Sequence, residues 1–176
     1  MTRQKKWISL AVILITLVIC YFPLCHRIDV FCIQLWDEGR NVANAVEMFN
    51  NHHWFTRYFE GKPDMWELKP PLLVWFQVLS LKLFGFNELA ARIPSMIFSM
   101  GTVLLLFWIC IQVTGNAIAG GISAVILVSC NGYIGEHVAR FGEHDVLLSF
   151  FTTALVYFWY LFIKSGSYRY FWLSCL

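Results

Sequence analysis

The stretch WDEGR is the first candidate for chemistry, because it places Asp37 three residues before Arg40 where a helical pattern begins. An aspartate there can accept hydrogen bonds from backbone N–H groups as a helix N-cap, and the local pattern alone favours that role. The alternative role is catalytic, in which a carboxylate with one oxygen left free takes a proton from an attacking hydroxyl group. Asp37 could fill both roles only if one of its carboxylate oxygens stays free of backbone hydrogen bonds.

A second candidate is Lys69 in the segment ELKPPL, directly before Pro70 and Pro71. Proline is tolerated in the first turn of a helix, so the pair predicts that a helix starts just after the lysine. A cation beside a helix N-terminus suits a phosphate group, because the backbone N–H groups there add donors. The alternative is a lysine that only extends its ammonium group from the membrane surface into water.

A third group of ionisable residues lies at the end of an apolar run, in the segment ARFGEHDVLL. Its members are Arg140, Glu143, His144 and Asp145. Ionisable groups so close to a bilayer are costly unless they are paired or serve a function. The simpler interpretation is a solvated loop in which Asp145 caps a helix beginning at Val146. His144 and His137 are available to a metal, but the sequence lacks a metal spacing such as HExxH.

The composition indicates that an integral membrane protein carries these groups. The chain has 176 residues, of which 59% are hydrophobic and 14% are charged, more apolar surface than a soluble domain of this length can bury. A net charge of +2 gives no reason to expect nucleic acid as a partner. The six cysteines form no CxxC pair, although Cys25 and Cys32 could pair in an oxidising compartment.

The predicted fold class is an all-α, polytopic membrane protein. A helix needs roughly 20 apolar residues to cross the hydrocarbon core. Four runs approach that length, and they predict transmembrane helices over 7–24, 94–113, 117–134 and 146–163. The run 170–176 is too short to span and represents a truncated fifth helix. The first run is longer than the apolar core of a signal peptide and lacks a cleavage site, so we expect it to remain as a helix.

The shorter run 71–84 is predicted to lie against the membrane instead of crossing it. Arg3 and the lysines beside it place the N-terminus in the cytoplasm by the positive-inside rule. With four crossings, Lys164 and Arg169 return to the cytoplasm, as that rule requires. A fifth crossing at 71–84 would put them outside.

This topology places all acidic side chains on one side of the membrane. The predicted external segments are 25–93 and 135–145, and every Asp and Glu falls within them. In the first segment, Val42, Val46 and Phe49 have the spacing of an amphipathic helix beside the membrane. Acid–base chemistry is therefore expected outside the cytoplasm.

The order of these elements resembles the N-terminal part of the GT-C superfamily of membrane glycosyltransferases. It is most similar to the protein O-mannosyltransferase-like group that includes the lipid A aminoarabinose transferases. The shared elements are Asp-Glu-x-Arg at the start of the first external loop, KPPL-x-x-W, FG-x-x-E-x-x-A-R-x-P-S, and an Asp after a short second external loop. The resemblance covers residues 7–163.

The resemblance implies a role for each matching residue. The first-loop aspartate of the family activates the acceptor, which implies a catalytic role for Asp37, and the acidic residue of the second loop implies a supporting role in catalysis for Asp145. The resemblance assigns Arg40 and Lys69 to the phosphate of the donor. Further residues near these positions are candidates for supporting the site: Glu38, Arg57, Glu67, Arg140 and His144.

A divalent metal ion is an open prediction. Aminoarabinose transferases carry a glutamate immediately before the lysine, where it can bind a metal. This sequence has Leu68 at that position and Glu67 one residue earlier. The candidate ligands are therefore Glu67 and His144.

The implied activity is transfer of a sugar from a polyprenyl-phosphate-linked donor to a hydroxyl group of a lipid, glycan or protein acceptor. The expected location is the outer face of the cytoplasmic membrane of a bacterium, in contact with its lipids. Family members are much longer, so we expect this chain to be an N-terminal portion.

The alternative is a small non-catalytic membrane protein or subunit whose charged external loop binds lipid or a partner protein. A transporter is disfavoured, because it would carry ionisable residues near the middle of its helices.

Overall fold

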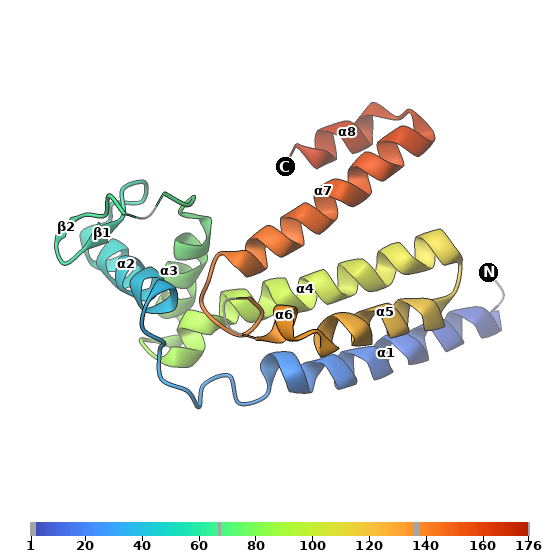
Figure 1. Cartoon of the computed structure of the whole chain (residues 1–176), viewed down its shortest axis with the longest axis horizontal. Helices are drawn as coiled ribbons and strands as arrows, with labels where there is room; N and C mark the ends of the chain where they lie inside the picture. The colour runs from blue at the N-terminus through green and yellow to red at the C-terminus, as the bar shows by residue number, and fades with distance from the viewer. Residues whose placement is uncertain (1–2, 67, 136–137, 176) are drawn as a thin grey trace.

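The computed structural model describes residues 3–66, 68–135 and 138–175, and it confirms that the chain is mostly helical. Four helices run along its long axis: α1 (Arg3–Cys25), α4 (Glu88–Thr114), α5 (Ala117–Ser129) and α7 (Asp145–Ser165) (Figure 1). Residues 26–87, which we call the head, lie at one end of these helices. The head contains α2 (Asp37–Asn51), α3 (Leu72–Phe84) and an antiparallel hairpin of β1 (Tyr58–Phe59) and β2 (Lys62–Pro63).

Three of the predicted spans each fall within a single helix. The spans 7–24 and 146–163 match α1 and α7 to within a few residues. The predicted span 94–113 lies within α4, which begins earlier, at Glu88, where the Asn87 side chain accepts a hydrogen bond from the Ala90 amide at 2.8 Å. A hydropathy count excludes that charged first turn, although its backbone is helical.

The predicted continuous helix over 117–134 is wrong. Helix α5 ends at Ser129, Cys130 is extended, and α6 (Asn131–Ile134) follows as a separate turn. Within the described part of the chain, α4 and α7 have the length and hydropathy of membrane spans, and α1 is 23 residues long. The short helix α8 (Tyr168–Ser174) folds back onto α7. The number of crossings stays a prediction.

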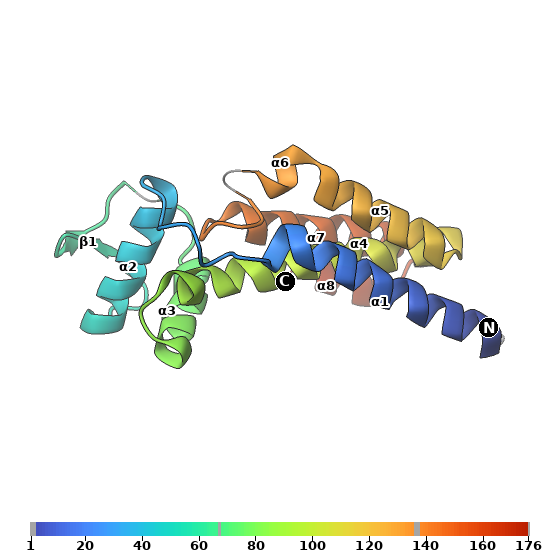
Figure 2. The same ribbon diagram turned by 90° about the horizontal axis from the view of Figure 1, so that it is seen from below.

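Helix α3 lies across the direction of the long helices, as Figures 1 and 2 show from two sides. Its Val74 and Val78 are buried against Met48 of α2 and Ala90 of α4. Leu79 on its other face is exposed. This crosswise packing agrees with a helix that lies along the membrane surface, which stays a prediction.

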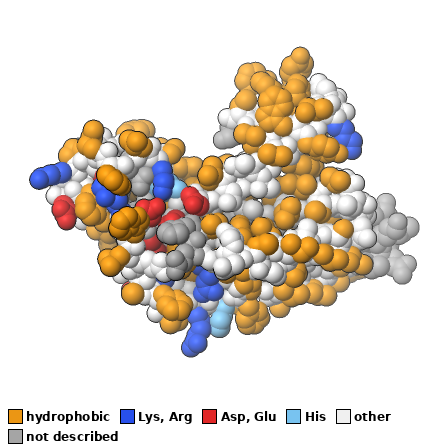
Figure 3. All heavy atoms as spheres, viewed as in Figure 1, with side chains coloured by type: hydrophobic (Ala, Val, Ile, Leu, Met, Phe, Trp, Pro, Cys, Tyr) orange, Lys and Arg blue, Asp and Glu red, His pale blue; other side chains and the backbone are white. Residues whose placement is uncertain are grey.

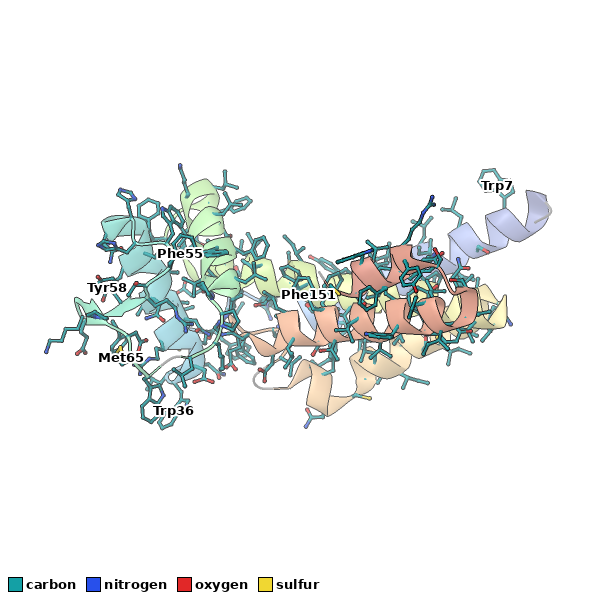
Figure 4. All side chains as sticks on the ribbon, turned by 90° about the horizontal axis from the view of Figure 1, so that it is seen from above. Trp7, Trp36, Phe55, Tyr58, Met65 and Phe151 are labelled. Atoms are coloured by element: carbon teal, nitrogen blue, oxygen red, sulfur yellow. The ribbon has the colours of Figure 1, made fainter. Side chains whose placement is uncertain are left out.

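On the face drawn in Figure 3, the described charged side chains gather toward the head. The N-terminus, the turn after α4 and the turn after α7 lie at the end opposite the head (Figure 1). Figure 3 shows most of the charged side chains of this face on the head and on the adjoining ends of the long helices. Trp7 lies far from the aromatic side chains of the head (Figure 4). The arrangement agrees with the predicted topology, which stays a prediction.

Close approach of α4 and α5 holds the long helices together. Gly120 of α5 faces the backbone of α4, and a Cβ atom added to it would lie 2.8 Å from the Phe107 carbonyl oxygen. Small residues allow such approach between helices in membranes. Nearby, Val103 of α4 and Ala124 of α5 are buried together with Cys20 of α1. Cys25 and Cys32 are both free, so the structure does not contain the disulfide that their spacing would allow.

Replacing Gly120 by alanine is expected to weaken the packing of α4 against α5. The new methyl group would overlap the Phe107 carbonyl oxygen, and overpacking of this kind costs about 1–3 kcal/mol of folding free energy. The thermal unfolding midpoint of the detergent-purified protein should therefore fall. Gly132→Ala is the matched control, since its added methyl group would meet no other part of the protein within 4 Å beyond its own turn of helix. Equal midpoints for the two variants would contradict the close approach.

Candidate functional site

The centre of the candidate site is an ion pair between Asp37 and Lys69. Asp37 is the first residue of α2, Lys69 stands just before α3, and 3.4 Å separates the Lys69 Nζ from the Asp37 Oδ2. The Asp37 side chain is 34% exposed and the Lys69 side chain is 41% exposed, so a ligand can reach both. The predicted N-cap role of Asp37 is wrong, because Trp36 occupies the N-cap position and makes no side-chain capping bond.

A tight turn before α2 presents Asp37 to the outside. Trp36 has a φ of 91°, a left-handed conformation that non-glycine residues rarely adopt, and its ring projects from the head (Figure 4). The turn is closed by a hydrogen bond from the Gly39 amide to the Gln34 carbonyl at 2.9 Å. A Cβ atom on Gly39 would lie 2.9 Å from that same oxygen, which explains the glycine in WDEGR.

Arg40 binds a carboxylate that the sequence analysis missed. Its Nε and Nη2 donate to the two oxygens of Asp64 at 2.8 and 2.6 Å, and its guanidinium lies over the Phe59 ring. The Asp64 side chain is fully buried and also accepts from the Asn44 side chain and the Trp66 amide. These bonds, the Arg40 pair foremost, hold the pKa of Asp64 far below its ordinary value despite burial. The pair ties residues 58–66 to α2.

Arg57 acts on the same segment. It is buried and donates from Nη2 to the carbonyl oxygen of Lys69. The supporting role predicted for Arg57 is therefore compatible with the structure as a role in placing Lys69. Together with the Arg40–Asp64 pair, this bond fixes the position of the Lys69 backbone, from which the side chain extends to Asp37.

A second ion pair, between Glu38 and Arg92, is entirely buried beneath the site. Arg92 Nε donates to Glu38 Oε1 at 2.7 Å and Arg92 Nη2 donates to Oε2 at 2.8 Å. The same carboxylate accepts from the amides of Gln34 and Gly142 at 2.8 and 2.9 Å. Burial raises the pKa of Glu38, but the hydrogen bonds from Arg92 and the two amides outweigh burial and lower it.

The loop before α7 is attached to the head through Gly142. Besides the amide bond to Glu38, its carbonyl accepts from the Asn41 side chain at 3.0 Å. A Cβ atom on Gly142 would lie 2.8 Å from the Nε2 atom of the buried Gln77. The two external segments predicted from the sequence are therefore packed together, and the loop carries Asp145 toward Lys69.

A groove of about 300 Å³ joins Lys69 to the start of α7. Its polar lining comes from Lys69, His144 and Asp145, whereas the rest of the lining is apolar: Pro70, Leu72, Leu147, Leu148 and Phe151. Asp145 is exposed and is the first residue of α7, so its predicted role as a cap is wrong; His144 holds the N-cap position without a side-chain capping bond. Lys69 and Asp145 therefore line one groove, and Asp37, which is not part of its lining, pairs with Lys69 beside it.

Other predicted residues lie elsewhere. Arg140 donates to the carbonyl oxygens of Pro23 and His26 at 3.0 and 2.9 Å, so it closes the end of α1 instead of facing the groove. Glu67 and His137 lie outside the described residues. In the described part of the chain, no three His, Cys, Asp or Glu side chains gather as metal ligands would, and a metal at Glu67 and His144 stays an open prediction.

Comparison with known proteins gives one family and several relatives. Residues 68–176 match the family described as dolichyl-phosphate-mannose-protein mannosyltransferase. An uncharacterized protein of Aquifex aeolicus is 26% identical over 173 residues, which is 98% of this chain and 33% of the relative. The undecaprenyl phosphate-alpha-4-amino-4-deoxy-L-arabinose arabinosyl transferase of Erwinia tasmaniensis is 26% identical over 155 residues, 84% of this chain and 26% of the relative.

Solved structures share the fold. The crystal structure of ArnT from Cupriavidus metallidurans bound to undecaprenyl phosphate superimposes with a TM-score of 0.70 at 21% sequence identity, over 88% of this chain and 27% of that one. The apo structure of the same protein gives a TM-score of 0.66. The chain therefore spans a third or less of the length of these curated relatives and solved structures.

The lowered pKa of Asp64 predicts a pH-dependent stability. Its ionised form stabilises the fold above the ordinary carboxyl pKa of about 4, and that contribution is lost as the pH falls below this value. Asp64→Asn should therefore lower the thermal unfolding midpoint at pH 7 and flatten its decline between about pH 5 and pH 3. The exposed Asp29→Asn is the matched control. An equal loss at pH 7 and pH 3 would refute a role for the ionised carboxylate.

Proposed function

The chain belongs to the dolichyl-phosphate-mannose-protein mannosyltransferase family, within the GT-C superfamily of membrane glycosyltransferases, and on that premise we propose that it forms the N-terminal part of a glycosyltransferase. The proposed reaction moves a sugar from a polyprenyl-phosphate-linked donor to a hydroxyl group of a lipid, glycan or protein acceptor. The proposed location is a bacterial cytoplasmic membrane, with the head on the extracytoplasmic side.

The observation that carries this proposal is the groove that joins Lys69 to Asp145. One end offers a lysine already facing a carboxylate, and the other consists of Leu147, Leu148 and Phe151 on α7. A polyprenyl phosphate has the same division, with an apolar chain and an anionic head. Undecaprenyl phosphate is bound in the solved ArnT structure that shares this fold, which supports the same class of ligand here.

In the proposed mechanism, the oxygen of the acceptor hydroxyl forms a bond to the anomeric carbon of the sugar. Asp37 accepts the proton that this hydroxyl group loses. The bond between that carbon and the phosphate oxygen breaks, and polyprenyl phosphate leaves with the bonding electrons. Lys69 stabilises the negative charge that develops on the leaving group. Arg40 stands one turn from Asp37 on α2, where the donor phosphate can approach its partly exposed guanidinium.

Asp145 lines the groove and is assigned a supporting role, in which it contacts the bound sugar or acceptor. Arg57 and Glu38 take part through the placement of other groups, since both are buried. His144 lines the groove beside Asp145 and completes its polar end.

Asp37→Asn keeps the size of the side chain but removes the proton acceptor. We expect the rate of transfer to fall by about 10²–10⁴-fold, with normal accumulation in the membrane and normal binding of undecaprenyl phosphate. The measurement is release of polyprenyl phosphate from a panel of polyprenyl-phosphate-linked hexoses and pentoses, in membranes that contain the protein carrying this chain.

Asp29→Asn, at an exposed position of the same external segment, is the control and should transfer normally. Full activity of Asp37→Asn would remove the basis for transfer chemistry. It would favour a non-catalytic membrane protein whose charged head binds lipid or a partner protein.

Lys69→Ala should weaken the binding of undecaprenyl phosphate by about 10-fold or more, because a hydrogen bond to a charged group contributes about 1.5–3 kcal/mol. Titration of the purified protein with undecaprenyl phosphate, with intrinsic tryptophan fluorescence as the signal, measures this affinity. Lys62→Ala on the exposed strand β2 removes an equal charge from the head and serves as the control. If both variants lose affinity equally, the phosphate responds to net charge and not to the groove.

A further inference from the structure

The ion pair between Glu38 of the head and Arg92 of α4 makes no direct contact in the proposed chemistry. Glu38 and Arg92 are completely buried, and neither is among the residues that line the groove. They belong to α2 and α4, two elements that are separated by 54 positions in the sequence at this contact. The pair therefore needs an explanation other than contact with a ligand.

Every hydrogen-bonding group of this pair is satisfied. Arg92 has five N–H donors, and the structure gives it five acceptors: both Glu38 oxygens and the carbonyl oxygens of Ile28, Phe31 and Cys32. Glu38 in turn accepts from Gln34 and Gly142 as well as from Arg92. Four segments of chain meet at this pair: the turn after α1, the start of α2, the first turns of α4, and the loop before α7.

Stability alone does not account for such a pair. Removing two charges from water is costly, and well-packed apolar residues of similar volume are often as stabilising. A fully satisfied buried network instead restricts the surrounding backbone to one arrangement, because any shift leaves a charged group without partners. The pair is thus suited to hold geometry.

The geometry that it holds includes Asp145, which lines the groove, and Asp37, which pairs with the groove residue Lys69. Asp37 directly precedes Glu38 on the first turn of α2, and Gly142, which donates to Glu38, lies three residues before Asp145. We infer that Glu38 and Arg92 are positioning residues for glycosyl transfer, which fix Asp37 and the loop leading to Asp145 relative to each other. This inference rests on the proposed function.

Lys69 depends on different contacts. Its segment is held by Arg57 and by the Arg40–Asp64 pair. Loss of the Glu38–Arg92 pair should therefore displace the proton acceptor while leaving the phosphate contact in place. A misplacement of about 1 Å in a catalytic group can reduce a rate by about 10²-fold.

The test measures kcat and the affinity for undecaprenyl phosphate separately in the variant Glu38→Gln. This variant keeps the shape of the side chain but places an NH₂ group against donors. We expect kcat to fall about 10²-fold per folded molecule, with the affinity for undecaprenyl phosphate unchanged. Glu47→Gln makes the same substitution elsewhere on α2 and should leave kcat at the wild-type value.

Two further variants keep the test decisive. Glu38→Gln combined with Arg92→Gln should show the same kcat as Glu38→Gln alone, because residues that act as a unit are not additive. Arg92→Lys retains the charge beside Glu38 and should lose less activity than Glu38→Gln. It also provides a measurement if Glu38→Gln does not accumulate.

The outcomes separate this inference from the proposed function. If Glu38→Gln transfers normally while Asp37→Asn does not, the positioning role is wrong and the glycosyltransferase proposal stands. If Asp37→Asn transfers normally, both fail. Parallel loss of kcat and donor affinity, or loss of folded protein in all of these variants, would leave the pair a structural role only and overturn the inference.

Discussion

The packing of the head against α4 is organised around the requirement to keep one carboxylate, that of Glu38, and one guanidinium, that of Arg92, charged in the interior. Burial of either group is costly unless hydrogen bonds replace the lost water. That requirement directs the surrounding chain, because carbonyl oxygens between residues 28 and 32 must point inward at Arg92, and the Gly142 amide must reach Glu38. The end of α1, the start of α2 and the loop before α7 therefore cannot shift independently.

Asp37 and Glu38 are neighbours in the sequence, but one is available to a ligand and the other has a structural role. Successive residues of an α-helix point about 100° apart, so Asp37 and Glu38 at the start of α2 face different surroundings. Glu38 is fully buried with Arg92, whereas Asp37 remains partly exposed beside Lys69. A buried carboxylate with four hydrogen bonds cannot take up a ligand, but it can fix the helix turn that presents the exposed one. The two acids adjacent in the sequence thus have complementary uses.

Much of this arrangement could be predicted from the sequence, but the partners could not. Apolar runs gave α1, α7 and the short α3, because hydropathy and helix length are local properties. The start of α4 and the break after α5 depend on backbone hydrogen bonding, which hydropathy does not measure. Asp64 and Arg92 were missed as site residues because their partners lie 24 and 54 positions away. Arg92 belongs to the motif FG-x-x-E-x-x-A-R-x-P-S, and that motif was the one sign in the sequence that this residue matters.

The place of the groove follows from the ligand that it is proposed to take. A donor with an apolar chain and a charged head needs a site where the long helices meet the head, and the groove runs from Phe151 of α7 to Lys69. The starts of α3 and α7 both border it, and helix N-termini favour anions. Asp37 would repel a phosphate, yet Lys69 lies beside that carboxylate and also lines the groove, so one cation can serve both charges. An acidic proton acceptor can then work next to an anionic leaving group.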